Sequence, residues 1–198
     1  MAPPLSEQAI RFTLSTGATD APSQLRRLLR VAAPPQVLVI DGDFSGSFAD
    51  PSEANDLISV LTDANLPVIA APSGSIGPQG AAILLLCDQV VLEAGAALSG
   101  HWRDGPCLAA LAHRRLGPLL ARAIFFDDRT DLLDILADAG IAKKADDPGG
   151  SLDSILSRLG GRSASMAKRA LKAAAELPFR EALNYDRWLH GRSGDETR

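Results

Sequence analysis

Residues 66–88, LPVIAAPSGSIGPQGAAILLLCD, decide the fold of this chain. Their first part, 67–71, is a short apolar run typical of a strand that is buried on both faces. Glycine, serine and proline are frequent in 72–80, which predicts a loop, and the wholly apolar segment 81–87 predicts a buried helix directly after it. A strand that passes through such a loop into a helix directs unpaired N–H groups of the helix start towards one point, where they can stabilise an oxyanion.

The same alternation of apolar runs and amphipathic segments continues on both sides of this stretch. Residues 37–40 and 89–92 are apolar runs, and 10–14 alternates with a period of two residues, so we expect three further strands. Apolar residues at helical spacing predict helices over 25–31 and 51–65. Strands that alternate with helices of this length predict right-handed crossovers and a mainly parallel sheet.

The second half of the chain is predominantly helical. We expect helices over 108–116, 118–126, 132–139, 152–159, then one that is capped by Ser163 or Ser165 and ends at Leu177, and a last one over 181–189. A short strand at 141–145 and a turn at 147–150 interrupt them, and the polar tail 191–198 is expected to fray. We place the α/β core at 1–160 and a C-terminal helical segment of the same domain at 161–198.

Composition excludes several classes of protein. The chain has 198 residues, 46% of them hydrophobic, which suffices for one domain with a sizeable core. Its formal net charge of −4 argues against nucleic acid as a partner. Its apolar runs are far shorter than the roughly 20 residues of a membrane span, and its first residues lack the pattern of a secretory signal. Two cysteines make neither a disulfide framework nor a metal cluster, so we expect a soluble, cytoplasmic protein without a metal.

One set of small and apolar residues in 67–88 has a recognisable spacing: Pro67, Val68, Ile69, Ala70, Ala71, Gly74, Gly80, Cys87 and Asp88. It resembles the signature of the crotonase (enoyl-CoA hydratase/isomerase) superfamily, Pro-Val-Ile-Ala-Ala-Val-Asn-Gly-x-Ala-x-Gly-Gly-Gly, followed by a helix that ends in Ala-Cys-Asp. Residues 44–50, Phe-Ser-Gly-Ser-Phe-Ala-Asp, resemble the family's Phe-Ser-Ala-Gly-Ala-Asp loop. Further weaker matches extend the resemblance over most of 25–189.

The resemblance implies a fold, a substrate class and an assembly. The fold is an α/β crotonase-like spiral of ββα units with mainly parallel sheets and a helical C-terminal region. The substrate is a thioester of coenzyme A or of the phosphopantetheine arm of an acyl carrier, and no separate cofactor is expected. The assembly is a homo-oligomer, a trimer or hexamer formed through 161–198, or a complex with another enzyme of the same pathway.

The resemblance also implies an oxyanion hole made of backbone groups. The thioester oxygen would lie between the N–H groups of Phe48 and Gln79, with Ser47 or Ala49 in place of Phe48 if the register shifts. A glutamine where the family has glycine narrows the approach to this point. The candidate substrate contacts are Ser47, Gly80 and Trp102.

The sequence departs from the hydratases of this family at both catalytic carboxylates. Those hydratases use two glutamates as acid and base on a bound water, and the aligned positions here are Ala82 and Trp102. The segment 48–65, which joins the loop to the next strand, is shortened to 18 residues, so we expect a different pocket. His101 and Asp104 remain as candidate catalytic residues. A partly exposed loop histidine and an ordinary turn aspartate are the commoner roles of such residues.

Three functions are compatible with these residues. The first is an acyl-thioester processing enzyme that performs isomerisation, dehydration, decarboxylation or thioester cleavage rather than simple hydration, as in the biosynthesis of specialised metabolites. The second is a non-catalytic accessory subunit that keeps the crotonase-like fold. The third is a Clp-protease-like serine hydrolase, which suits His101. However, the nucleophilic serine of that family aligns near Pro78, and Ser73 and Ser75 lie upstream of this position.

Other polar residues have alternative, structural explanations. Basic residues of the C-terminal helices are candidate contacts for nucleotide phosphates, but each as readily occupies a solvated helix face: Lys168, Lys172, Arg187 and Arg192. Four aspartates stand close together but match no calcium-loop spacing, and helix capping explains them better: Asp127, Asp128, Asp131 and Asp134. Cys87 is expected in the core.

Overall fold

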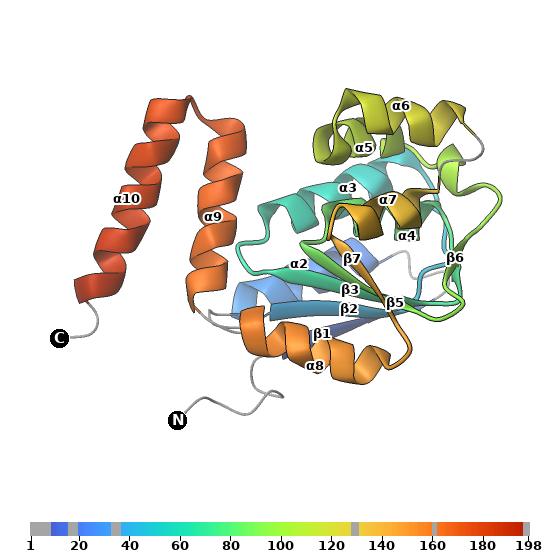
Figure 1. The fold of residues 1–198 in the computed structure, drawn as a ribbon, viewed down its shortest axis with the longest axis horizontal. Coiled ribbons are helices and arrows are strands. Elements are labelled where there is room, and N and C mark those ends of the chain that lie inside the picture. The colour runs from blue at the N-terminus through green and yellow to red at the C-terminus, as the bar shows by residue number, and fades with distance from the viewer. Residues whose placement is uncertain (1–8, 16–19, 33–36, 128–130, 160–161, 196–198) are drawn as a thin grey trace.

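The computed structural model describes residues 9–15, 20–32, 37–127, 131–159 and 162–195. Five strands form one parallel sheet in the order β1-β2-β3-β5-β7 (Figure 1). They are β1 (Ala9–Leu14), β2 (Val37–Asp43), β3 (Val68–Ser73), β5 (Gln89–Glu93) and β7 (Ala142–Ala145). Because every neighbouring pair is parallel, the carboxyl ends of all five strands lie at one edge of the sheet and their amino ends at the other.

Helices cover both faces of this sheet, as strands made of continuous apolar runs require. One face carries α2 (Ala21–Val31), α3 (Pro51–Asp63), α4 (Pro78–Leu86) and α7 (Leu132–Asp138), and the other carries α8 (Pro148–Leu159) (Figure 1). Alternate residues of β2 show the division, because successive side chains of a strand point to opposite faces. Leu38 and Ile40 belong to the larger core, whereas Val37 and Val39 belong to the smaller core beneath α8.

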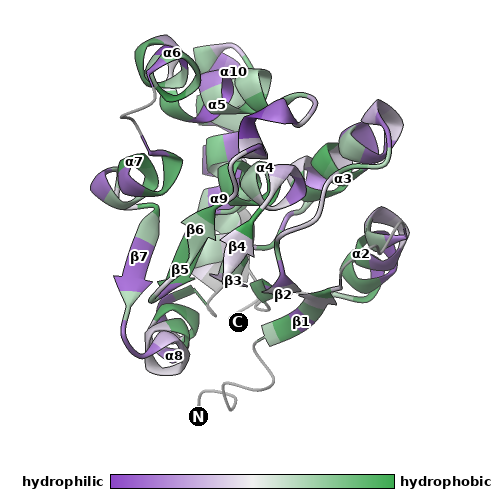
Figure 2. Cartoon of the chain, turned by 90° about the vertical axis from the view of Figure 1, so that its right-hand side faces the viewer, coloured by the Kyte–Doolittle hydropathy of each residue, from purple (hydrophilic) through white to green (hydrophobic). Residues whose placement is uncertain are grey.

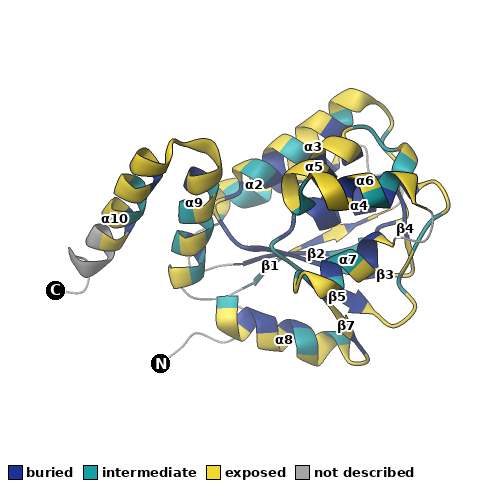
Figure 3. Ribbon diagram, turned by 45° about the horizontal axis from the view of Figure 1, so that its top comes forward, coloured by how far each residue is buried: buried dark blue, intermediate teal, exposed yellow. Residues whose placement is uncertain are grey.

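Four further helices lie outside these two layers. α5 (Leu108–Leu116) and α6 (Pro118–Phe126) lie over α4, and α9 (Arg162–Glu176) and α10 (Phe179–Asp195) form a pair at the amino edge of the sheet (Figures 1 and 3). The Asp88 carboxylate accepts hydrogen bonds from the Val68 N–H at 2.7 Å and from the Lys168 ammonium at 2.8 Å. One carboxylate therefore joins α9 to the start of β3.

A small second sheet lies beyond the carboxyl ends of the strands. Here β4 (Ser75–Ile76) pairs in parallel with β6 (Ala97–Leu98), and the two lie below α4 in Figure 2. The short 3-10 helix η1 (Trp102–Asp104) follows β6. This edge holds the residues that the sequence indicates for function.

The predicted α/β class, with a mainly parallel sheet and a helical C-terminal region, is confirmed, but several local predictions are wrong. The expected loop 72–80 contains β4, and α4 already begins at Pro78, because proline suits the first position of a helix. The expected turn at 147–150 is the start of α8, where the Ser151 N–H donates to the Asp147 carbonyl at 3.1 Å.

The C-terminal helices also differ from expectation. Ser163 and Ser165 do not cap α9, because the helix already begins at Arg162. α10 extends to Asp195, through most of the tail that was expected to fray. Asp128 lies outside the described residues. Among the described helices, none has both the length and the apolar character that crossing a membrane requires.

Candidate functional site

The loop 44–50 and the start of α4 are joined by two backbone hydrogen bonds at the carboxyl edge of the sheet. The Gly77 N–H donates to the Phe44 carbonyl at 2.9 Å, and the Gln79 N–H donates to the Gly46 carbonyl at 3.0 Å. A Cβ atom on Gly80 would lie 2.4 Å from the Phe44 carbonyl oxygen, so this contact requires glycine. The two segments of the crotonase-like signature therefore meet closely.

The segment 97–105 reaches the same place through β6. The Ala97 N–H donates to the Gly74 carbonyl at 3.0 Å, and the Ser99 N–H donates to the Ile76 carbonyl at 2.8 Å. Further along, a Cβ atom on Gly105 would lie 2.7 Å from the Cβ of Pro78. These contacts bring 97–105 beside the first turn of α4.

The two predicted oxyanion-hole donors differ in their present partners. The Gln79 N–H is bonded to Gly46, as described above, whereas the Phe48 N–H has no acceptor among the residues that the structure describes. The Ala49 N–H donates to the Glu53 carboxylate at 2.6 Å. Of the alternatives to Phe48 as the first donor, Ala49 is thus already engaged, whereas the Ser47 N–H, like that of Phe48, has no described acceptor.

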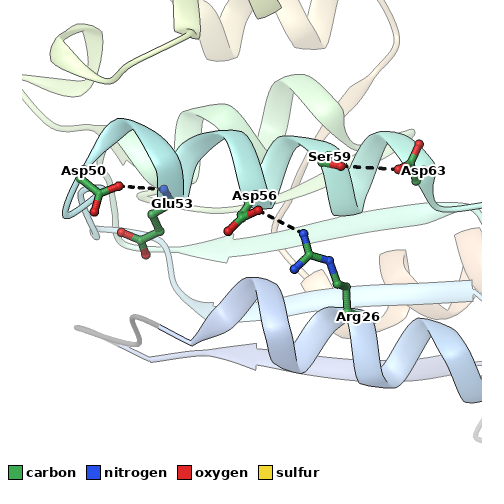
Figure 4. Close-up of polar contacts among 6 residues, drawn as sticks. All are labelled: Arg26, Asp50, Glu53, Asp56, Ser59 and Asp63. Atoms are coloured by element: carbon green, nitrogen blue, oxygen red, sulfur yellow. Dashed lines mark hydrogen bonds and ion pairs between the residues drawn. The ribbon is translucent and has the colours of Figure 1, made fainter.

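The start of α3 holds the loop 44–50 in place. The Asp50 carboxylate accepts the N–H groups of Ser52 at 2.7 Å and Glu53 at 3.0 Å, and so caps the helix (Figure 4). The hydrogen bond from the Ser52 hydroxyl, followed by those from the two N–H groups, holds the pKa of Asp50 below its ordinary value. These hydrogen bonds fix the last residue of the loop 44–50 at the start of α3.

The Gln79 side chain lies against Gly46, the residue whose carbonyl accepts the Gln79 N–H. Gln79 is 9% exposed, and its Oε1 lies 2.7 Å from the position of a Cβ built on Gly46. A substrate oxygen that accepts from the Gln79 N–H has to replace the Gly46 carbonyl. Both the Gln79 side chain and the loop 44–50 therefore narrow the approach to the Gln79 N–H.

The candidate catalytic residues flank η1. His101 precedes η1 and Asp104 ends it, with the Asp104 N–H donating to the His101 carbonyl at 3.1 Å. Both side chains are exposed and make no hydrogen bond within the described part of the chain. They are brought to the same turn, but they do not form a hydrogen-bonded pair, and their catalytic role stays a prediction.

Trp102 lies in the core. It is 4% exposed, its ring packs against Phe125 at a centroid distance of 5.8 Å, and the Arg103 guanidinium lies 5.2 Å from its ring centre. Ala82, at the other aligned glutamate position, is also fully buried. Core packing explains the position of Trp102 without a substrate. The predicted binding of substrate by Trp102, by exposed Ser47 and by buried Gly80 stays a prediction.

Ser99 is a polar residue that the resemblance places near the pocket, although it is not one of the candidate catalytic residues. Its hydroxyl is buried and has no hydrogen-bond partner, while its N–H pairs with the Ile76 carbonyl. Nothing in the sequence around a single serine indicates burial. Only the pairing of β4 with β6 brings Ser99 beside α4.

The remaining nucleophiles and cations occupy other environments. Ser73 and Ser75 are exposed on β3 and β4, upstream of α4, and Pro78 occupies the first position of that helix. Cys87 is buried, and this burial strongly raises the pKa of its thiol, as expected of a core cysteine. Lys172 pairs with Asp63 at 3.3 Å. No cluster of potential metal ligands occurs in the described part of the chain.

Solved structures share this architecture, although no protein-family model and no curated protein matches the sequence. An enoyl-CoA hydratase from Bacillus anthracis superposes with a TM-score of 0.76 at 15% identity, over 93% of this chain and 86% of its own. An enoyl-CoA hydratase from Polaromonas sp. JS666 gives a TM-score of 0.73 at 18% identity, over 93% of this chain and 88% of its own. Subunit I of an enoyl-CoA hydratase from Geobacillus kaustophilus HTA426 gives a TM-score of 0.71 at 18% identity, over 89% of this chain and 79% of its own.

These superpositions establish the fold. The chain has the crotonase fold, so the predicted spiral architecture is confirmed. Identities below 20% speak for the fold alone, and the reaction has to be argued from the site.

Proposed function

We propose that this protein binds an acyl thioester, of coenzyme A or of an acyl carrier, and stabilises its carbonyl oxygen with the N–H groups of Phe48 and Gln79. The observation that carries the proposal is the close contact of the loop 44–50 with the start of α4, which brings the Phe48 N–H, for which no acceptor is described, to the segment that holds the Gln79 N–H. The Gln79 N–H now donates to the Gly46 carbonyl at 3.0 Å, so the substrate oxygen would displace that carbonyl. Two such donors stabilise negative charge on an oxygen without any side chain.

The reaction that we propose is proton transfer at the carbon next to the thioester carbonyl, not hydration. Hydration by two glutamates has no counterpart here, because the aligned Ala82 and Trp102 are uncharged and buried. An oxyanion hole makes the neighbouring C–H bond acidic. His101 would accept this proton and return it to the same or another carbon, with Asp104 as the second candidate group. Isomerisation and decarboxylation both proceed through such an enolate, and either suits specialised biosynthesis.

Deuterium exchange tests this proposal directly. In D2O, the methyl protons of acetyl-CoA should exchange faster with the protein than without it, as followed by NMR. Phe48→Leu keeps the backbone N–H and should keep the exchange, whereas Phe48→Pro removes the N–H and should abolish it. Absence of saturable binding of acetyl-CoA and of acetylated acyl-carrier protein, measured by calorimetry, would contradict the proposal.

A non-catalytic accessory role is the second candidate, and one observation favours it. The Gly46 carbonyl and the Gln79 side chain together occupy the approach to the helix start. An accessory subunit should bind neither thioester, but should bind a partner enzyme. For the third candidate, the Clp-protease-like hydrolase, a serine-directed fluorophosphonate probe should label the protein, and an unlabelled protein would remove it.

We also propose that the protein self-associates through the C-terminal helices. α10 is largely exposed in Figure 3, and large apolar side chains are exposed on this pair, with Leu171 71% and Phe179 78% accessible. Contact with further copies would remove this apolar surface from water. Light scattering should give a mass of several chains, and Leu171→Glu with Phe179→Glu should reduce it to one. A single-chain mass for the wild type would contradict this assembly.

A further inference from the structure

A cavity of about 660 Å³ opens at the amino edge of the sheet, opposite to the loop 44–50. Its walls are the last turns of α2 and α3, the residues that follow these helices, and the first turns of α9. Figure 1 shows α9 beside the ends of α2 and α3 that form these walls. The volume falls within the range of small-molecule sites, roughly 300–1,000 Å³.

The charges around this cavity are predominantly positive. Three arginines, Arg26, Arg30 and Arg169, line it, against one acidic residue, Asp63, among the described lining residues. Asp63 already accepts from Lys172 at 3.3 Å and from the Ser59 hydroxyl at 3.5 Å, and the second of these contacts is drawn in Figure 4. The cavity therefore favours an anion.

The three arginines differ in how far they are engaged. Arg26 pairs with Asp56 at 3.2 Å on the exposed faces of α2 and α3 (Figure 4). Arg169 donates to the Tyr185 hydroxyl at 3.1 Å and lies 6.0 Å from the centre of that ring, so its described partner is an aromatic side chain and not a carboxylate. Arg30 makes no hydrogen bond or ion pair within the described part of the chain. Two guanidinium groups are thus available for an anion.

A buried hydroxyl without a partner lies on the same wall. Ser165 is 2% exposed, and its Oγ has no hydrogen-bond partner. A polar group buried in this way is costly unless something binds it. Leu29, Val60 and Met166 add apolar surface to the lining.

We propose that this cavity binds a small amphiphilic anion, a carboxylate or a phosphate ester with an apolar chain. Its oxygens would accept hydrogen bonds from the guanidinium groups of Arg30 and Arg169, whose planar shape suits both anions. The Ser165 hydroxyl would donate the remaining bond, and the apolar chain would lie against Leu29 and Met166. This site is separate from the proposed thioester site, because the two lie at opposite edges of one sheet.

Calorimetry on the full chain with three probes of one chain length tests the proposal. Octanoate and octyl phosphate distinguish the two head groups, and 1-octanol is the neutral reference. At least one of the anions should bind saturably, and at least tenfold more tightly than octanol. Arg30→Gln should weaken this binding by about tenfold or more. Arg180→Gln, which makes the same change of charge on exposed α10, should leave it unchanged.

Ser165→Ala provides a test that general destabilisation cannot imitate. Because the hydroxyl has no partner in the folded chain, its removal should leave the melting temperature unchanged or raise it. The same variant should weaken anion binding by about three- to tenfold. Equal binding of the anions to the wild type and Arg30→Gln would overturn the proposal. So would an Arg30→Gln variant that changes the mass of the assembly while neither anion binds the wild type, because the cavity would then be a contact with a second copy.

Discussion

The two edges of the parallel sheet differ in what meets there. At the carboxyl edge two segments are in direct backbone contact, because the Gln79 N–H donates to Gly46 and Gly80 packs on the Phe44 carbonyl. At the amino edge three helices leave a cavity of about 660 Å³ between them, and Ser165 on its wall has a hydroxyl without a partner, as Ser99 has at the carboxyl edge. The first contact is made by backbone groups of the loop 44–50 and the start of α4, and the cavity is lined by side chains of three helices. A backbone site leaves a sequence signature, whereas a site between distant helices does not.

The largest effect is expected from Gly80→Ala at the carboxyl edge. The new Cβ would lie 2.4 Å from the Phe44 carbonyl oxygen, so the loop 44–50 has to move away from α4. We expect a loss of about 3 kcal/mol in the free energy of unfolding, measured in urea. Gly100→Ala is the matched control, since nothing lies within 4 Å of its Cβ position, and it should stay within about 0.5 kcal/mol. Equal stabilities of the two variants would show that the carboxyl edge is not closely packed.

Asp88→Ala should have the next largest effect, at the amino edge. It leaves the Val68 N–H without its acceptor and removes the partner of Lys168, whose side chain is 14% exposed. We expect a loss of about 2 kcal/mol in urea unfolding. Lys172→Ala breaks the more exposed pair with Asp63 and should cost less than about 1 kcal/mol. A similar loss for both variants would mean that Asp88 is not the anchor of α9.

Gln79→Gly should open the carboxyl edge. The substitution removes the side chain that covers Gly46 while it keeps the N–H that the proposed hole uses. We expect acyl-thioester binding to become tighter by on the order of fivefold, about 1 kcal/mol. Binding is measured by calorimetry with acetyl-CoA. Unchanged or weaker binding would show that the glutamine does not restrict the approach.

The smallest effect concerns the pH dependence of the α3 cap. Because hydrogen bonds lower the pKa of Asp50 in the folded chain, the cap contributes its full stability above the unfolded pKa, about 3.9. That contribution is lost as the pH falls through the lower folded value. The difference in melting temperature between the wild type and Asp50→Ala should therefore shrink from pH 6 to pH 3. Asp50→Asn keeps a capping side chain that does not titrate, so its melting temperature should differ from that of Asp50→Ala by the same amount at pH 6 and pH 3. If this difference shrinks as much as the difference between the wild type and Asp50→Ala, the account is contradicted.

The strands were predictable because a strand buried on both faces is a continuous apolar run, as in β2 and β3. The start of α8 was not, because Asp-Pro-Gly-Gly has the composition of a turn, and packing against the smaller core decides that it is helical. For the site, the resemblance located the segments around Phe48 and Gln79. The burial of Ser99 depends on the pairing of β4 with β6, which a local pattern does not encode.

By itself, the sequence determined the class of fold, the order of its elements and the two backbone segments that meet at the start of α4. The class and the order of the main elements follow from local composition, since apolar runs, prolines and glycines constrain the chain residue by residue, whereas the two segments follow from the resemblance. Only the tertiary structure decided that the Gln79 N–H is bonded to Gly46, that Trp102 is buried, and that Arg30 and Ser165 share a cavity. Such relations join residues far apart in the chain, and their distances are set by packing rather than by sequence spacing.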